Sequence, residues 1–242
     1  MHVPKIHLEW GLEGLDAALA RQDVVAIVDV LSFCTTVCAA LAQGASIAPV
    51  PWGEDAEAWA ERFEPKALTR NEGGRRALSP LGFDASSAGK LYAISSPNGA
   101  HFSHRGKAAP ALFAACLRNA SASAQALQEC AADLTCDISV IACGERWPVE
   151  GMAAHVGPLR VALEDGLGAA AVIAGLAGEL SADARIAARI FEQSYQELDE
   201  LLCACPSGVE LIERDLRDEV SFAAEYDVEH FAARLVGERY TL

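Results

Sequence analysis

The 242-residue sequence is short of positive charge, with 19 Lys and Arg against 34 Asp and Glu and a formal net charge of −15. Proteins that bind nucleic acid or anionic membranes draw much of their affinity from Lys and Arg. We therefore expect neither nucleic acid nor a membrane among the partners. A small anionic ligand would need local compensation from a metal ion, a helix terminus or an arginine.

Long apolar runs are also missing. No stretch approaches the roughly 20 apolar residues that cross a bilayer, and the nearest, Leu167–Leu176, is short and rich in alanine and glycine. Residues 1–23 are polar and mixed, without the apolar segment of a signal peptide. We expect a cytoplasmic protein.

The eight cysteines form no C-x-x-C pair, and most lie in apolar surroundings. Free cysteine in such a setting behaves as a small hydrophobic residue. Buried thiols are therefore favoured over a zinc site. Cys143, which follows the apolar run 138–142, is the one thiol that we consider as a catalytic nucleophile.

Short apolar segments alternate with helical patterns along the chain. The expected strands are 24–31, 46–50, 91–95, 110–116 and 138–143. The expected helices are 36–43, 55–63, 121–132, 159–180, 182–193, 197–203, 207–215 and 218–225. This alternation predicts a layered α/β/α fold with a largely parallel or mixed sheet and a helical C-terminal part.

Two irregular stretches interrupt this pattern. Residues 69–90 contain Gly73-Gly74 with the basic residues Arg70, Arg75 and Arg76, and residues 147–158 separate a strand from the next helix. Loops of this length are usually functional loops, lids or linkers. We expect one α/β domain over residues 1–242, or two lobes divided near 70–90 or 145–158.

The apolar strand 24–31 carries an acid, Asp29, and is soon followed by Thr35 and Thr36. Burying an unpaired Asp29 within the strand would be costly, so we expect it at the strand's carboxyl end, where α/β sheets bind ligands. The threonine hydroxyls suit a helix N-cap, and helix N-termini bind anions. A divalent metal beside a phosphate is one interpretation, and an ordinary loop acid is the other.

Another strand, 91–95, is followed by Ser96, Asn98 and Gly99. Their hydroxyl and amide groups could bind an anion, although Asn-Gly is also a common turn sequence. Further on, Arg118 offers a fork for phosphate, carboxylate or sulfonate, and Asn119 could cap the following helix.

A second acidic pair, Glu164-Asp165, precedes a small-residue helix. Acids near a helix start favour the helix dipole and need have no other role. A magnesium site beside Asp29 would nevertheless need further oxygen ligands of this kind.

The order of these segments resembles the 2-phosphosulfolactate phosphatase family. The motifs that carry the resemblance are Asp29-Val30-Leu31 with Thr35-Thr36, Pro97-Asn98-Gly99, Asn119-Ala120, Ala142-Cys143-Gly144, Leu163-Glu164-Asp165 and the tail 207–223. The resemblance implies an α/β, magnesium-dependent phosphatase that hydrolyses a phosphate ester of a sulfonated hydroxy acid, a step towards coenzyme M. The sequence departs from the family pattern in three places. Ser32 stands where the family usually has an arginine after Asp-Val-Leu, and Ser96-Pro97 stands where Thr-Thr is usual. Gly82-Phe83-Asp84 is followed by Ala85-Ser86-Ser87 where the family usually has Gly-Asn-Ser-Pro.

The resemblance implies a site in which three acids hold or orient Mg²⁺: Asp29, Glu164 and Asp165. Polar groups would surround the phosphate or acid group: Thr35, Thr36, Ser96, Asn98, Gly99 and Asn119. Arg118 would pair with an anionic group of the substrate, and the nucleophile would be Asp29, Cys143 or an activated water. Homodimer formation is a further expectation.

Two alternatives remain at this point. A catalytically silent relative could bind a small anion without turning it over, and the missing arginine at Ser32 favours that reading. A haloacid-dehalogenase-type phosphatase would need a second aspartate where Leu31 stands.

Overall fold

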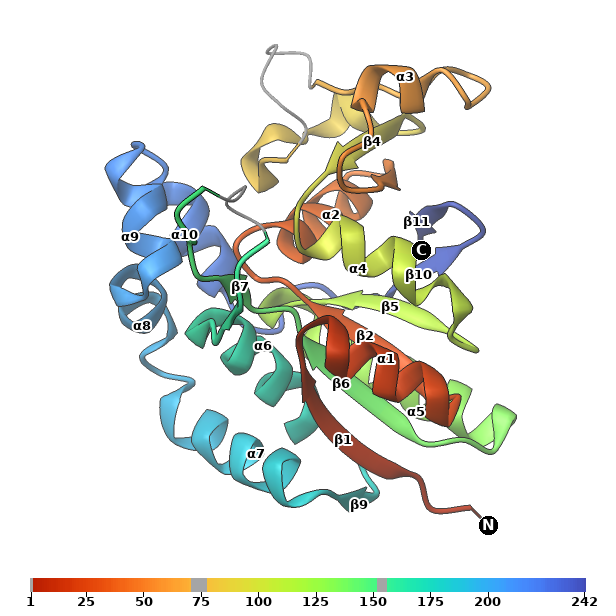
Figure 1. The fold of residues 1–242 in the computed structure, drawn as a ribbon, viewed down its shortest axis with the longest axis vertical. Helices are drawn as coiled ribbons and strands as arrows, with labels where there is room; N and C mark the ends of the chain where they lie inside the picture. The colour runs from red at the N-terminus through yellow and green to blue at the C-terminus, as the bar shows by residue number, and fades with distance from the viewer. Residues whose placement is uncertain (1, 71–77, 152–155) are drawn as a thin grey trace.

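A computed structural model describes residues 2–70, 78–151 and 156–242. Within these ranges nine strands form one mixed sheet in the order β4-β3-β11-β10-β5-β2-β6-β1-β9 (Figure 1). The strands are β1 Lys5–Trp10, β2 Val24–Val28, β3 Ser46–Val50, β4 Leu91–Ser95, β5 Leu112–Ala115, β6 Ile138–Ala142, β9 Glu179–Leu180, β10 Ala233–Val236 and β11 Arg239–Thr241.

The sheet consists of two parallel blocks joined by a hairpin. β5, β2, β6, β1 and β9 run parallel to one another, as do β3 and β4. The β10–β11 hairpin lies between the blocks and pairs antiparallel with β5 on one side and β3 on the other. The predicted α/β fold with a mixed sheet is confirmed.

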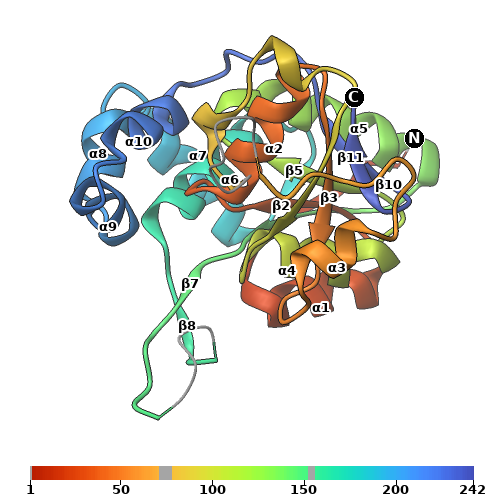
Figure 2. The ribbon, with the colours of Figure 1, turned by 90° about the horizontal axis from the view of Figure 1, so that it is seen from above.

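Strand β2 is buried on both faces, as its continuous apolar sequence predicts. Val25 and Ile27 pack against α1 (Gly11–Arg21), α2 (Phe33–Ala42) and α4 (Gly99–Arg105). Val24 and Val28 pack against α5 (Ala120–Leu134), α6 (Leu163–Ala174) and α7 (Ala182–Ser194). Figure 2 shows α1 and α4 on one side of the sheet and α5 to α7 on the other.

Four further helices lie outside these layers. α3 (Ala56–Ala60) packs near β4, and α8 (Leu198–Ala204), α9 (Pro206–Glu213) and α10 (Arg217–Ala224) gather beside α6 at the left of Figure 1. None of the helices in the described ranges is long and apolar enough to cross a membrane.

The structure corrects one expected helix and adds strands and a helix that the sequence analysis did not include. The polar N-terminal stretch forms β1 and α1, because one half-buried edge-side strand and an amphipathic helix need few apolar residues. The helix expected over 159–180 is divided into β8 (Leu159–Arg160), α6 and β9, with Gly175 as the C-cap of α6. The C-terminal part is not all helical, because the β10–β11 hairpin buries Tyr240 in the sheet.

The two irregular stretches are partly described. Gly73-Gly74, Arg75 and Arg76 lie outside the described residues, and the rest of that segment includes the short turns Pro80–Gly82 and Ala85–Ser87. In the other stretch, β7 (Glu145–Arg146) pairs antiparallel with β8 to form a ribbon that projects from the body of the molecule (Figure 2).

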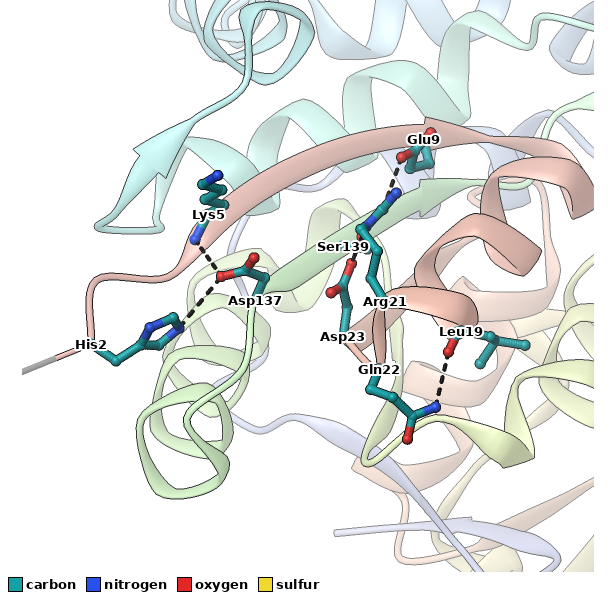
Figure 3. Close-up of polar contacts among 9 residues, drawn as sticks. All are labelled: His2, Lys5, Glu9, Leu19, Arg21, Gln22, Asp23, Asp137 and Ser139. Atoms are coloured by element: carbon teal, nitrogen blue, oxygen red, sulfur yellow. Dashed lines mark hydrogen bonds and ion pairs between the residues drawn. The ribbon is translucent and has the colours of Figure 1, made fainter.

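A polar network lies at the amino ends of β2 and β6 and reaches Glu9 near the carboxyl end of β1 (Figure 3). The buried Asp23 Oδ2 accepts hydrogen bonds from Arg21 Nε at 2.8 Å and from Ser139 Oγ at 2.7 Å. Arg21 Nη2 also donates to Glu9 Oε1 at 2.9 Å. This buried acid is therefore matched by a cation.

Candidate active site

Asp29 follows the last residue of β2 and is only 4% exposed. Its Oδ2 accepts a hydrogen bond from Gly99 N at 2.7 Å, and its Oδ1 accepts one from Phe33 N at 3.2 Å. A Cβ on residue 99 would meet the Phe33 ring at 2.2 Å, so glycine is required for this close approach. The fold thus joins the start of α4 to the carboxyl end of β2 through the Asp29 carboxylate.

The acidic pair of α6 lies beside Asp29. Asp165 Oδ1 accepts from Val30 N and Oδ2 from Gly144 N, both at 2.8 Å, so this carboxylate fastens the loops after β2 and β6. Glu164 is 1% exposed, and its Oε2 has no hydrogen-bond partner among the described residues. The first turn of α6 therefore contributes one acid that is fully bonded and one that is not.

The electrostatics show that these three acids are neighbours. Burial raises the pKa of Asp29 to about 6, the charge of Glu164 adds to the shift, and the N–H groups of Gly99 and Phe33 oppose it. Burial and the charges of Asp29 and Glu164 hold the pKa of Asp165 well above its usual range. The structure thus brings together Asp29, Glu164 and Asp165, which are distant in the sequence.

The turn after β4 completes one wall of the cluster. The Ser96 hydroxyl lies within hydrogen-bonding range of Asp29 and accepts from Asn98 N at 3.2 Å. The Asn98 side chain hydrogen-bonds to Glu145 on β7. Ser96, Asn98 and Gly99 therefore border the acids as their sequence position suggested.

Glu145 is a member of the cluster that sequence reasoning missed. Burial raises the pKa of Glu145 to about 7, with a further contribution from the charge of Asp29, while the Asn98 hydrogen bond and Arg160 oppose the shift. The signal was its place directly after Ala142-Cys143-Gly144 at the end of β6. A carboxyl with a pKa near neutrality can donate or accept a proton at physiological pH.

The residues fit a hard cation that retains part of its water shell. Carboxylate oxygens are the preferred ligands of Mg²⁺, and Glu164 Oε2 is a buried, unpartnered one. No group of three or more acidic, histidine or cysteine side chains in the described part of the chain forms a metal cage. The arrangement therefore suits an ion held by one or two carboxylates and by water, as Mg²⁺ often is.

The threonines do not cap α2. Thr35 Oγ1 donates to the Val30 carbonyl and Thr36 Oγ1 to the Ser32 carbonyl, each at 2.7 Å, and both residues are fully buried in the first turns. The N-cap position is Ser32, which forms no side-chain capping bond. The capping expectation was wrong because a Thr side chain inside a helix can bond to a preceding carbonyl.

The Arg118 side chain contacts α10 and the segment that follows it. Its Nη1 donates to the Phe222 carbonyl at 2.9 Å and pairs with Glu225, and its Nη2 bonds Glu229 at 3.1 Å. The guanidinium also stacks on the Phe222 ring. The structure therefore engages Arg118 with α10 and the segment after it rather than with the acidic cluster.

Asn119 also has a local role in the structure. Its Oδ1 accepts from Cys116 N at 2.9 Å and its Nδ2 donates to the Ala114 carbonyl at 3.4 Å, which closes the turn after β5. It occupies the N-cap position of α5 but forms no side-chain capping bond there.

Cys143 lies at the end of β6, and its N–H donates to the Val28 carbonyl at 2.9 Å. Burial, together with the charges of Asp29 and Asp165, holds the pKa of the Cys143 thiol well above its usual range. The reactive form of a cysteine is its thiolate, which these surroundings disfavour.

A separate apolar groove of about 820 Å³ lies between β1, α6 and α7. Its charged lining consists of acids: Glu9, Glu13 and Asp183. Without a cation in its lining, this groove is a poor site for an anionic ligand.

Comparison with known proteins identifies the family of this chain. The family model for 2-phosphosulpholactate phosphatase matches residues 13–237. The chain belongs to this family. A relative from Pseudothermotoga lettingae, named a probable 2-phosphosulfolactate phosphatase, is 25% identical over 235 residues, covering 93% of this chain and 95% of the relative. The family match includes every element that contributes to the acidic cluster.

Proposed function

We propose that the protein is a magnesium-dependent phosphatase that hydrolyses the phosphate monoester of a small anionic hydroxy acid resembling 2-phosphosulfolactate. Family membership supports the reaction class. The observation that best supports a bound Mg²⁺ is the buried Glu164 Oε2, which has no hydrogen-bond partner among the described residues and lies beside Asp29. Like charges brought together in a dry site require a cation or protons, and Mg²⁺ would supply the charge.

In this proposal Asp29 and Glu164 hold Mg²⁺ directly or through water, and Asp165 orients the loops that present them. When bound, the ion supplies Lewis-acid chemistry and neutralises charge on the transferring phosphoryl group. Ser96, Asn98 and the adjacent backbone border the phosphate. Thr35, Thr36 and Asn119 support the surrounding turns through the backbone carbonyls and N–H groups to which they bond.

Water is the nucleophile that we favour. Both oxygens of Asp29 already accept backbone hydrogen bonds, and the Cys143 thiol is held in its neutral form. Glu145 has a pKa suited to moving a proton, either from the attacking water or to the departing alkoxide. Water adds to phosphorus, the ester P–O bond breaks, and the products are inorganic phosphate and the hydroxy acid.

The test is phosphate release from 2-phosphosulfolactate, from 2-phospholactate and from p-nitrophenyl phosphate, with Mg²⁺ and after chelation. We expect Mg²⁺-dependent release that is fastest with 2-phosphosulfolactate. Phosphate release that continues after chelation would contradict the proposed dependence on Mg²⁺. Binding of sulfolactate in calorimetry without release of phosphate from any ester identifies a silent relative instead.

A further inference from the structure

Resting on the proposed function, we propose that Arg160 binds the second anionic group, sulfonate or carboxylate, of the phosphorylated substrate. It would supply the positive charge that Arg118, which is engaged by two glutamates, does not. Three observations carry this assignment.

The first is the position of Arg160 in the β7–β8 ribbon. Arg160 is the cross-strand partner of Glu145, and side chains of directly opposed residues lie on the same face of a sheet. Glu145 is hydrogen-bonded to Asn98 and senses the charges of Asp29 and Glu164. The Arg160 side chain therefore shares the face that is turned towards the acidic cluster.

The second is the anchoring of the ribbon at both ends. It starts next to Gly144, whose N–H bonds Asp165, and it returns at Arg160, four residues before Glu164. A Cβ on residue 144 would meet the Leu159 side chain at 2.7 Å, so the two strands of the ribbon are closely packed at this end. These contacts hold the end of the ribbon that contains Arg160 next to the acidic cluster.

The third is that its donors are largely unused. Arg160 Nη2 reaches the Ser207 hydroxyl at 3.5 Å, and its guanidinium lies 5.9 Å from the centroid of the Trp147 ring. Within the described ranges Arg160 forms no ion pair, although its charge acts on the opposed Glu145. The more exposed Arg21 and the buried Arg118 each contact two carboxylates. A guanidinium has five N–H donors arranged to bind carboxylate or sulfonate oxygens in pairs.

Ser207 gives the proposed subsite a second polar wall. It is buried in the first turn of α9, next to Cys205, whose pKa is raised to about 12 by burial and by the adjacent Glu164 carboxylate. Arg160, Ser207 and Glu164 thus lie around one region at the border of the acidic cluster. A substrate with phosphate at the acids and a second anion at Arg160 would match this distribution of charge.

The experiment compares Arg160→Gln and Arg160→Lys with the matched control Arg146→Gln. Arg146 lies on the same ribbon but opposite Leu159, on the face that packs towards α1. For Arg160→Gln we expect kcat/KM for 2-phosphosulfolactate to fall about 10- to 100-fold, the loss typical of a charged hydrogen bond. The loss should appear mainly in KM. Turnover of p-nitrophenyl phosphate should change less than about threefold when each variant is compared at its own pH optimum, because loss of Arg160 also shifts the pKa of Glu145. Arg160→Lys should recover part of the loss.

An equal loss on both substrates, or no loss on either, overturns the assignment. Calorimetry with sulfolactate tests it without the hydrolytic step: wild type and Arg146→Gln should bind alike, and Arg160→Gln should bind at least about tenfold more weakly. Binding that depends on Arg160 in a protein that releases no phosphate refutes the phosphatase but keeps the subsite. Hydrolysis that is insensitive to Arg160 refutes the subsite but keeps the phosphatase. Absence of both binding and hydrolysis in the wild type overturns both.

Discussion

Buried carboxylates stand at both ends of β2, Asp23 before its first residue and Asp29 after its last. Asp23 is matched by Arg21 and by the Ser139 hydroxyl (Figure 3). Asp29 instead has Glu164 and Asp165 as charged neighbours, and only N–H and hydroxyl groups oppose its raised pKa. The amino end of the sheet neutralises its acid within the protein, whereas the acids at the carboxyl end need protons or, in the proposed function, a bound cation.

We expect the acid at the amino end of β2 to matter for stability and the acid at the carboxyl end to matter for activity. A matched buried ion pair needs its partner to keep the fold stable, because removal of one charge leaves the other uncompensated. A group of like charges destabilises the folded protein when it is fully ionised, and it is retained where a ligand supplies the missing charge. The predictions below test whether the two ends differ in this way.

The largest effect is expected for Asp29→Asn. Loss of a metal-holding carboxylate should lower kcat/KM by about 1,000-fold, equivalent to roughly 4 kcal/mol of transition-state stabilisation. The free energy of unfolding without Mg²⁺ should stay constant or rise, since one of three repelling charges is removed. Steady-state kinetics and urea unfolding measure the two quantities. A large loss of stability with little loss of activity would make Asp29 equivalent to Asp23.

The second prediction concerns pH and Mg²⁺. The folded-state pKa of Asp29 is raised from 3.8 to about 6, so the folded protein binds its proton more tightly than the unfolded chain does. The metal-free protein should therefore lose stability as pH rises from about 4 to 6, by roughly 3 kcal/mol from this group.

Mg²⁺ should offset this loss above pH 6. At pH 7.5, Mg²⁺ at about 100 times its Kd should add about 2.7 kcal/mol and raise Tm by about 5–10 °C. At pH 5 the shift should fall by more than half, because protons compete for the same carboxylates. Thermal scans at both pH values measure it, with Asp29→Asn as the control that should not respond. Equal shifts at both pH values would show that the ion binds elsewhere.

The third prediction addresses the amino end. Arg21→Met removes the cation beside Asp23 and should lower the free energy of unfolding by about 2 kcal/mol. This loss is smaller than the usual cost of breaking a buried pair because the Arg21 side chain is 33% exposed and Ser139 still donates to Asp23. Once folded, the variant should retain wild-type kcat/KM. A change in kcat/KM without a change in stability would show that the two ends are not independent.

The smallest effect is expected for Cys143→Ser. Because burial and nearby acids keep the Cys143 thiol neutral, a hydroxyl in its place should change kcat less than about threefold. A loss of 1,000-fold, with inactivation of the wild type by a thiol-alkylating reagent, would instead restore Cys143 as nucleophile. Phosphate release before and after alkylation provides the measurement.

Local sequence correctly predicted the strands whose residues are nearly all buried in similar surroundings. β3 and β4 have the predicted bounds, and the unbroken apolar run of β2 correctly indicated burial on both faces. It was a poor guide to the β10–β11 hairpin, whose short strands pair with β5 and β3, both more than one hundred residues away in the sequence. Such pairing depends on partners that no local window contains.

At the candidate active site, the acidic residues were easier to predict from the sequence than a positively charged residue that would face them. Asp29, Glu164 and Asp165 were identifiable because acids beside apolar strands or at a helix start are conspicuous. Arg118 looked available in the sequence, yet two glutamates and an aromatic ring engage it in the structure. Glu145 was unremarkable until folding placed it next to Asn98.

Composition and the local hydrophobic pattern were enough to predict the layered α/β class and to make Asp29, Glu164 and Asp165 candidates for one site. Which charges lie together depends on how the chain folds. The tertiary structure paired Arg21 with Asp23, engaged Arg118 with α10, and left the carboxylates after β2 and in α6 facing one another. The physical reason is that the pKa of a carboxyl and its need for a counter-charge depend on burial and on neighbours from distant segments, and neither is encoded in the residue's own sequence context.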